Sequence, residues 1–223
     1  MIQLVVFDMA GTTVDEQNVV YKTVHQALLR GGFDVSLDTV LWHGAGKEKF
    51  QAIKDVLAHL QNGVVDEKVA KAIHKDFEQL LDAAYAVLQP LPMPGAEEVF
   101  AALRARGIKV VLNTGYKRTV AEFLLHRLKW TVGTTVDMLY TADDTTMGRP
   151  HPDMIQAAMA ALGVTDAKNV AKIGDSMIDI EEGKNAGCGI AAGITTGAQS
   201  EEQLRLAEPT HILHGLGEVL ELV

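Results

Sequence analysis

Apolar residues gather into short runs along the chain, and each run ends in polar or turn-forming residues. Residues 4–7 lead into Asp8, residues 110–112 lead into Asn113, and residues 170–173 form a third run of the same kind. Short β-branched runs bounded by turn residues are typical of buried strands. Weaker runs predict three further strands, at residues 138–140, 189–192 and 211–213.

Helical periodicity separates most of these runs. Apolar residues recur at intervals of three and four between the predicted strands, which indicates amphipathic helices. The predicted helices are residues 97–106, 119–128, 153–162, 178–186 and 215–222. Alternation of strand and helix predicts an α/β fold with a Rossmann-like, three-layer parallel sheet core.

One stretch interrupts the alternation. Residues 16–92 contain no convincing strand, and an apolar stripe at helical spacing runs through their second half: Val69, Ile73, Phe77, Leu80, Leu81, Ala84 and Leu88. Core packing in a helical bundle explains this stripe. Pro90, Pro92 and Pro94 then mark a linker. We therefore expect a core domain of residues 1–15 and 93–223 with an all-helical insert at residues 16–92.

Composition and charge narrow the class of protein. The 223 residues are 48% hydrophobic and 22% charged, which is typical of a globular protein. The formal charge of −9 argues against a nucleic-acid or anionic-membrane surface as partner. No apolar stretch approaches the ~20 residues that span a bilayer. Cys188 is the single cysteine and cannot form an internal disulfide, so we expect a cytoplasmic protein.

Polar residues stand where the predicted strands end. Asp8, Thr114 and Asp175 each follow an apolar run. Ligands of open parallel sheets bind beyond the carboxyl ends of the strands. The fold would gather these three side chains into one crevice, although a single aspartate at such a place is also a common helix cap.

Four segments in order resemble the motifs of the haloacid dehalogenase superfamily, with a helical cap inserted after the first. They are Asp8-Met9-Ala10-Gly11-Thr12-Thr13, Thr114-Gly115, Arg149, and Gly174-Asp175-Ser176-Met177-Ile178-Asp179. The resemblance covers almost the whole chain. Within the superfamily the chain most resembles the branch of phosphonoacetaldehyde hydrolases (phosphonatases) and phosphonatase-like hydrolases. The residues that carry this resemblance are Ala10, Arg149 and Lys47.

The resemblance implies a Mg²⁺-dependent hydrolase. Asp8 is the implied nucleophile toward phosphorus, forming an aspartyl-phosphate. Asp8, Asp175 and the backbone carbonyl of Ala10 would hold Mg²⁺, and Asp179, one helical turn beyond Asp175, would support this metal site from the same face.

The phosphonate oxygens have implied partners as well. These are Thr114, Gly115 and the backbone amides of Met9 and Ala10. Tyr116 matches the phosphonatase version of the motif, and either contacts substrate or packs. Arg149 stands where most of the superfamily has lysine and would bind the nucleophile and the phosphoryl oxygens.

The leaving group distinguishes the branches. Most phosphatases of the superfamily carry an aspartate as general acid where this chain has Ala10. In phosphonatases a cap lysine forms a Schiff base with the substrate aldehyde, and Lys47 matches its position. Lys49 offers a second amine two residues away. Helical geometry directs at most one of the two toward the crevice.

Three residues depart from the phosphonatase pattern. Phe50 replaces a histidine implicated in proton transfer, His43 replaces a methionine, and Asn18 replaces a cysteine. His43 either takes over the proton transfer or is a loop histidine bonded to the backbone. The departures leave the phosphoryl half of the site intact.

Four functions are compatible with these residues. The preferred hypothesis is cleavage of the C–P bond of a 2-oxoalkylphosphonate such as phosphonoacetaldehyde. The alternative is a phosphatase acting on a small phosphate monoester, with Lys47 as an anion-binding cation. Asp175 argues against a metal-independent dehalogenase, and the intact motifs argue against an inert binding module. The sequence leaves the oligomeric state open, and a homodimer is compatible with it.

Overall fold

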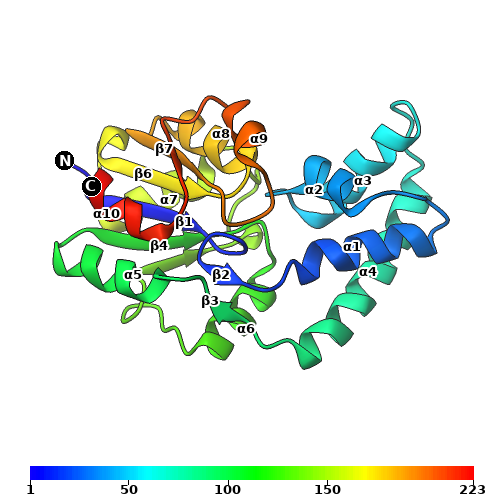
Figure 1. Ribbon diagram of the computed structural model, residues 1–223, viewed down its shortest axis with the longest axis horizontal. Coiled ribbons are helices and arrows are strands. Elements are labelled where there is room, and N and C mark those ends of the chain that lie inside the picture. Colours follow the sequence, from blue (N-terminus) through cyan, green and yellow to red (C-terminus); the bar gives the residue numbers. More distant parts are fainter.

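The computed structural model describes residues 1–223 and is built on a parallel sheet. Its strands are β1 (Leu4–Asp8), β4 (Lys109–Asn113), β5 (Met138–Tyr140), β6 (Val170–Gly174), β7 (Ile190–Ile194) and β8 (His211–Leu213). Their order is β5-β4-β1-β6-β7-β8, and every neighbouring pair is parallel (Figure 1). The predicted α/β class with a Rossmann-like, three-layer parallel core is confirmed.

Helices cover both faces of this sheet. They are α5 (Ala96–Ala105), α6 (Arg118–Leu128), α7 (Asp153–Leu162), α8 (Met177–Ala186), α9 (Glu201–Arg205) and α10 (Val219–Leu222). Phe7 of β1 packs on Phe100 of α5, with ring centroids 5.6 Å apart. Val6, one residue earlier, joins a separate apolar cluster with Ile155 of α7. Because successive side chains of a strand point to opposite faces, one apolar strand supports both helical layers.

The termini of some elements differ from the predicted ones. Residues 215–222 form a 3₁₀ turn, η3 (Leu216–Glu218), followed by α10, rather than one helix. Helix α9 was not predicted, because five residues are too few to show a period. Its start is fixed locally, since Ser200 and Gln203 cap each other's backbone amides. Two further 3₁₀ turns are η1 (Ala142–Asp144) and η2 (Ala167–Asn169).

Four helices lie between the first strand and the rest of the sheet. They are α1 (Val19–Arg30), α2 (Leu37–Gly44), α3 (Lys49–Leu60) and α4 (Glu67–Val87). Figure 1 shows them as one group to one side of the sheet, opposite the two chain termini. Of the predicted stripe on α4, Ile73, Phe77 and Leu81 are buried. We call these four helices and their loops the helical cap.

Side-chain caps fix where three of these helices begin. Ser36 accepts the amide of Thr39 before α2, and Asp66 accepts the amide of Lys68 before α4. Glu48 accepts the amides of Phe50 and Gln51 before α3. Carboxylate and hydroxyl oxygens at this position satisfy amides that the helix leaves unpaired. We call residues 45–49, the connection between α2 and α3 together with the first residue of α3, the cap loop. The helix start at Lys49 determines where the two lysines of this loop, Lys47 and Lys49, point.

A two-stranded ladder joins the cap to the sheet domain. β2 (Val14–Asp15) pairs antiparallel with β3 (Leu91–Pro92), and the amide of Met93 donates to the carbonyl of Thr13. β3 falls inside residues 16–92, where no strand was expected. Two-residue strands leave no periodic signal, and Pro92 argues against a strand in sequence terms. None of the helices combines the length and the hydrophobicity of a membrane-spanning segment.

Candidate active site

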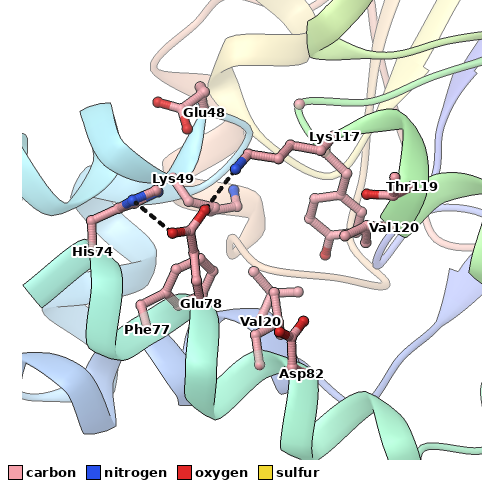
Figure 2. A pocket seen from close by; sticks show the side chains of 13 residues that line it. Val20, Glu48, Lys49, His74, Phe77, Glu78, Asp82, Lys117, Thr119 and Val120 are labelled. Carbon is pink, nitrogen blue, oxygen red and sulfur yellow. Dashed lines mark hydrogen bonds and ion pairs between the residues drawn. The ribbon is translucent and has the colours of Figure 1, made fainter.

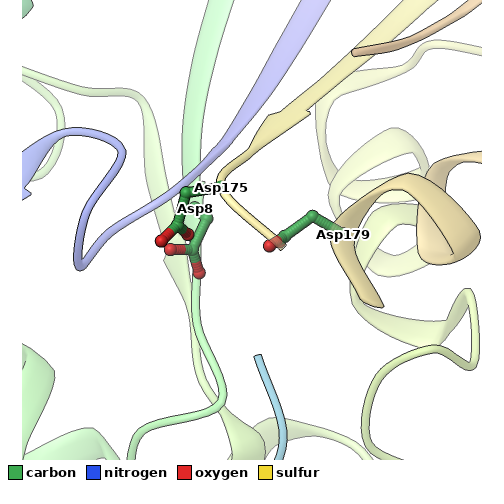
Figure 3. A group of neighbouring side chains, drawn as sticks. All are labelled: Asp8, Asp175 and Asp179. Carbon is green, nitrogen blue, oxygen red and sulfur yellow. The ribbon is translucent and has the colours of Figure 1, made fainter. Parts of the chain in front are cut away.

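Two strand ends and one helix bring acidic side chains together at one edge of the sheet. Asp8 is the last residue of β1 and lies opposite Asn113 of β4. Asp175 follows β6 directly, and Asp179 lies in the first turn of α8. Figure 3 shows Asp8 and Asp175 side by side, with Asp179 approaching from α8. One carboxylate oxygen of each lies within 4.8 Å of the others, and all three residues are buried.

Arg149 compensates the charge of Asp8. Its Nη1 lies 2.8 Å from Oδ1 of Asp8 and also contacts Oδ1 of Asp179. Burial raises the pKa of Asp8, and the neighbouring charge of Asp179 adds to this, while Arg149 acts in the opposite direction. Arginine keeps its charge and hydrogen-bonding geometry when buried. The predicted contact between Arg149 and Asp8 is therefore present.

Asp175 is the member of the group without a cationic partner. Its Oδ2 accepts the amide of Ala198 at 2.5 Å, and Oδ1 accepts the hydroxyl of Thr12 at 3.4 Å. It takes part in none of the ion pairs of the chain. Burial and the charge of Asp8 raise the pKa of Asp175 well above its usual range. A divalent cation between Asp8 and Asp175 would supply the missing positive charge, so these residues fit a Mg²⁺ site.

Asp179 supports this group from a different position. Its Oδ1 accepts from Lys172 Nζ at 2.7 Å and from Arg149, and its Oδ2 accepts from Ser176 Oγ. Burial opposes ionisation, but Arg149 and Lys172 outweigh it and lower the pKa of Asp179. With both carboxylate oxygens already engaged, Asp179 holds Arg149 and Lys172 beside the metal-binding pair.

A buried network behind the site was missed at the sequence level. Lys172 is fully buried in β6, and its Nζ donates to Oδ1 of Asn113 at 2.8 Å and lies 3.5 Å from Glu182. Asn113 in turn donates to both carboxylate oxygens of Glu182. The available signal was a lysine inside an apolar strand, because a charge there requires a partner.

The phosphoryl-binding candidates surround a narrow cavity. Thr114, Gly115 and Tyr116 line it together with Ala10, Asp8, Arg149 and Asp175. Its volume is about 10 Å³, which is room for about one water molecule. Gly115 is in contact with the cap, since a Cβ atom there would lie 3.0 Å from the carbonyl oxygen of Gly46. The cap loop therefore closes this cavity on the side that faces the helical cap.

The two cap-loop lysines point in different directions. Lys47 Nζ pairs with Oδ2 of Asp55 at 2.5 Å, and Lys47 does not line the cavity. Lys49 is 7% exposed and lines it. This corrects the position expected for Lys47. Lys47 precedes the N-cap of α3, so its side chain turns back onto the helix, whereas Lys49 is the first helical residue and faces the sheet edge.

Two other predicted residues have different surroundings. His43 stacks on His59 within the cap, with ring centroids 4.3 Å apart, and does not line the cavity. The structure therefore does not bring His43 to the site. Met9 is buried, and its carbonyl accepts the amides of Thr13 and Val14, which closes the turn after β1. Tyr21, which was not predicted, lines the cavity, and its hydroxyl accepts the amide of Gly46.

A larger cavity opens beside the narrow one, between the cap and α6. Its volume is about 310 Å³, and Lys49, Gly115 and Tyr116 line both cavities. Figure 2 shows Glu78 of α4 reaching across this space to Lys117, with Nζ 2.7 Å from Oε1. A cavity of this size accommodates the organic part of a small substrate.

Comparison with known proteins identifies the family. A family model of haloacid dehalogenase-like hydrolases matches residues 2–187. Phosphonoacetaldehyde hydrolase of Bacillus thuringiensis (strain Al Hakam) is 31% identical over 222 residues, covering 91% of this chain and 81% of the relative.

Solved structures share the fold. A phosphonoacetaldehyde hydrolase-like protein from Oleispira antarctica superposes with a TM-score of 0.83 at 22% identity, covering 99% of this chain and 91% of that chain. A predicted phosphoglycolate phosphatase from Haemophilus somnus gives a TM-score of 0.79 at 19% identity, covering 99% and 97%. The family-model match spans the strand ends that carry Asp8 and Asp175. The chain therefore belongs to the haloacid dehalogenase-like hydrolases, a family of enzymes.

Proposed function

We propose that this hydrolase cleaves the C–P bond of a 2-oxoalkylphosphonate such as phosphonoacetaldehyde, in a Mg²⁺-dependent reaction. The observation that carries the proposal is a lysine amine buried at the cavity that holds Asp8, in a chain with Ala10 at the general-acid position. The similarity to curated phosphonoacetaldehyde hydrolases supports it.

The phosphoryl half of the reaction falls to residues at the sheet edge. Asp8 attacks phosphorus to form an aspartyl-phosphate, and Arg149 holds Asp8 in place and faces the phosphonate oxygens. Thr114 and Gly115 line the same cavity and provide hydrogen-bond donors for these oxygens. Asp8, Asp175 and the Ala10 carbonyl would hold Mg²⁺, and the bound ion would stabilise the charge that develops at phosphorus.

The carbon atom that leaves phosphorus requires an acceptor for the electron pair of the C–P bond. A carbanion is a poor leaving group, and a carboxylic acid could not protonate it away as it would an alkoxide. An iminium formed between substrate and a lysine amine accepts the electron pair of the C–P bond instead. This chemistry makes the methyl side chain of Ala10 compatible with catalysis.

We further propose that residues 16–92 act as a cap that opens and closes over the sheet edge. A volume of about 10 Å³ at Asp8 is too small for a phosphonate group, so substrate entry requires the loop around Gly46 to move away from Gly115. Closing would then exclude bulk water from the aspartyl-phosphate.

Hydrolysis of a small phosphate monoester is the second candidate. Phe50 favours it, because phosphonatases have a histidine at this position, and the cap lysines would then bind an anionic group of the substrate. Ala10 opposes it, since general acid catalysis typically contributes about 10²- to 10⁴-fold for such leaving groups.

The test is release of inorganic phosphate from phosphonoacetaldehyde with Mg²⁺, run beside p-nitrophenyl phosphate. We expect turnover of the phosphonate that ceases on chelation, and a loss of at least about 10³-fold in Asp8→Asn, which lacks the nucleophile. Turnover of the ester alone would select the phosphatase. Activity that survives complete chelation would contradict the metal site.

A further inference from the structure

The cap loop offers two amines, and their surroundings differ. Resting on the proposed C–P cleavage, we infer that Lys49, rather than Lys47, is the amine that forms the Schiff base with the substrate carbonyl. Lys49 lines both the narrow cavity at Asp8 and the larger one beside it. It therefore stands where the carbonyl carbon of a phosphonate held at Asp8 would lie.

Contacts from two tyrosines and the loop backbone fix the Lys49 amine at this junction. Its Nζ lies 4.7 Å from the ring centroid of Tyr21 and 5.6 Å from that of Tyr116. It donates to the carbonyl of Lys47 at 2.5 Å. Nζ has no carboxylate partner in the structure. The amine is thus held in position by a backbone hydrogen bond and two aromatic rings rather than by a salt bridge.

Lys47 is held by a different set of contacts. Asp55 of α3 accepts a hydrogen bond from Lys47 Nζ through one carboxylate oxygen. Its other oxygen accepts a hydrogen bond from Nε2 of Gln51 at 2.6 Å. The Lys47 side chain is 28% exposed and lines neither cavity. An ammonium paired with a carboxylate has no free electron pair to attack a carbonyl.

The surroundings of Lys49 destabilise its charged ammonium form and so increase the share of neutral amine. Burial, followed by the positive charge of Arg149, lowers the pKa of Lys49 to about 8. At pH 7 roughly a tenth of the amine is then unprotonated. Desolvation near another cation is a known means of activating lysine nucleophiles.

An unsatisfied hydroxyl group lies at the same junction. Tyr116 is 5% exposed, lines both cavities, and its hydroxyl has no hydrogen-bond partner. A buried donor without a partner is costly, which indicates that a ligand satisfies it. The oxygen of the substrate carbonyl, or of the carbinolamine formed from it, is the group that Lys49 would bring there.

The covalent steps balance. The Lys49 ammonium releases a proton, and the neutral amine adds to the carbonyl carbon. The resulting carbinolamine takes up a proton at its hydroxyl group and loses water to give an iminium. When Asp8 bonds to phosphorus, the C–P bond breaks and its electron pair forms the enamine. The enamine carbon that was bonded to phosphorus takes up a proton, which restores the iminium. Water then hydrolyses the iminium and releases the carbonyl product and Lys49. A second water hydrolyses the aspartyl-phosphate, giving phosphate.

The experiment is borohydride trapping of the protein with phosphonoacetaldehyde, followed by fragment-ion mass spectrometry of the peptide that contains both lysines. We expect the reduced adduct on Lys49 of the wild type. In Lys49→Arg we expect no reduced adduct and a rate of phosphate release from the phosphonate that is lower by at least about 10³-fold. Lys47→Arg should still carry the adduct, which is the label followed here. Circular dichroism of both variants controls for folding.

Two other outcomes are distinguishable. An adduct on Lys47 in the wild type, with label kept in Lys49→Arg, would overturn the assignment while leaving C–P cleavage intact. No adduct and no phosphate from the phosphonate, with p-nitrophenyl phosphate still hydrolysed, would overturn the proposed function itself. The position of the label in the wild type does not depend on whether either variant folds.

Discussion

Three aspartates at the sheet edge show how surroundings divide one residue type among different tasks. Asp179 is ionised by Lys172 and Arg149, which lower its pKa, whereas burial raises the pKa of Asp8 and of Asp175. Only Asp8 among the raised pair has a cation beside it. The pair Asp8 and Asp175 therefore fits a divalent cation, and Asp179 holds Arg149, the cation beside Asp8, which we propose as the nucleophile.

Gly197 controls the position of Asp175. A Cβ atom at Gly197 would collide with the Asp175 carboxylate, and the next amide, of Ala198, donates to that carboxylate. We expect Gly197→Ala to displace Asp175 and to raise the Mg²⁺ concentration for half-maximal activity about ten- to a hundredfold. Phosphate release at increasing Mg²⁺ measures this. Gly217→Ala is the matched control, because beyond its immediate chain neighbours nothing lies within 4 Å of the added methyl group. An unchanged Mg²⁺ dependence in Gly197→Ala would contradict the contact.

Glu16 makes stability depend on pH. It is 2% exposed, and burial raises its pKa from 4.5 to about 8 against the smaller effect of hydrogen bonds from the Val20 and Val19 amides. Between these two values the folded protein binds a proton that the unfolded chain has released. The free energy of unfolding therefore falls as pH rises through this window.

Glu16→Gln removes this titration. We expect the stability of the wild type to decline relative to the variant between pH 5 and 8, by on the order of 4 kcal/mol in total. Urea unfolding of both proteins across this range gives the difference. Parallel pH profiles would show that Glu16 is ionised in the folded state.

Sequence reasoning at the residue scale works where a side chain's position follows from its strand. Asp8, Thr114 and Asp175 end apolar runs, so the parallel sheet alone brings them together. The direction of Lys47 and Lys49 does not follow in this way. It depends on Glu48 capping α3 and on Asp55 attracting Lys47, and both contacts form only in three dimensions.

Secondary-structure elements follow the sequence pattern where they are long and buried. All six strands of the sheet were predicted, since each is an apolar run, and α7 matches its predicted range. The β2–β3 ladder and α9 were not predicted. Their few residues are held by pairing partners distant in sequence or by a local cap, and segments this short show no hydrophobic periodicity in the sequence.

Strand β6 carries a charge at its centre, and its stability should depend on that charge. Lys172→Met would leave Asp179 and Glu182 buried with one compensating cation fewer. We expect a loss of about 3–5 kcal/mol in the free energy of unfolding, measured with urea. Lys71→Met is the control, because this 68% exposed lysine pairs with Glu67 at the surface and should change stability by less than about 1 kcal/mol. Equal stability of Lys172→Met and wild type would contradict this account.

At the scale of the whole molecule, the site is formed by two parts that are far apart in the chain. The cap loop contributes Gly46 and Lys49, and the sheet edge contributes Gly115 and the carboxylates. Glu78 and Lys117 join the same two parts across the larger cavity. Activity should therefore respond to contacts between cap and sheet that touch no reacting atom.

The Glu78–Lys117 pair tests this coupling. Both side chains are about half exposed, so the pair should contribute only about 0.2–1 kcal/mol. We expect Glu78→Gln and Lys117→Met each to lower kcat/KM by about 1.5- to 5-fold, with the double variant no worse than either. Steady-state kinetics of this double-mutant cycle, repeated at high salt, measures the coupling. Fully additive effects would show that the pair is absent when the substrate reacts.

The central place of β1 has a consequence for biosynthesis. Leu4 pairs with Lys109 on one side and with Val170 on the other, so neither neighbour exists when β1 leaves the ribosome. The cap helices pack on one another, α1 on α4 and α2 on α3, and all four are made before β4. We therefore expect the cap to fold first in the nascent chain. Until β4 is made, the buried strand β1 has no partner, and its second neighbour, β6, follows only at residues 170–174, so β1 stays open to association with other chains for much of synthesis.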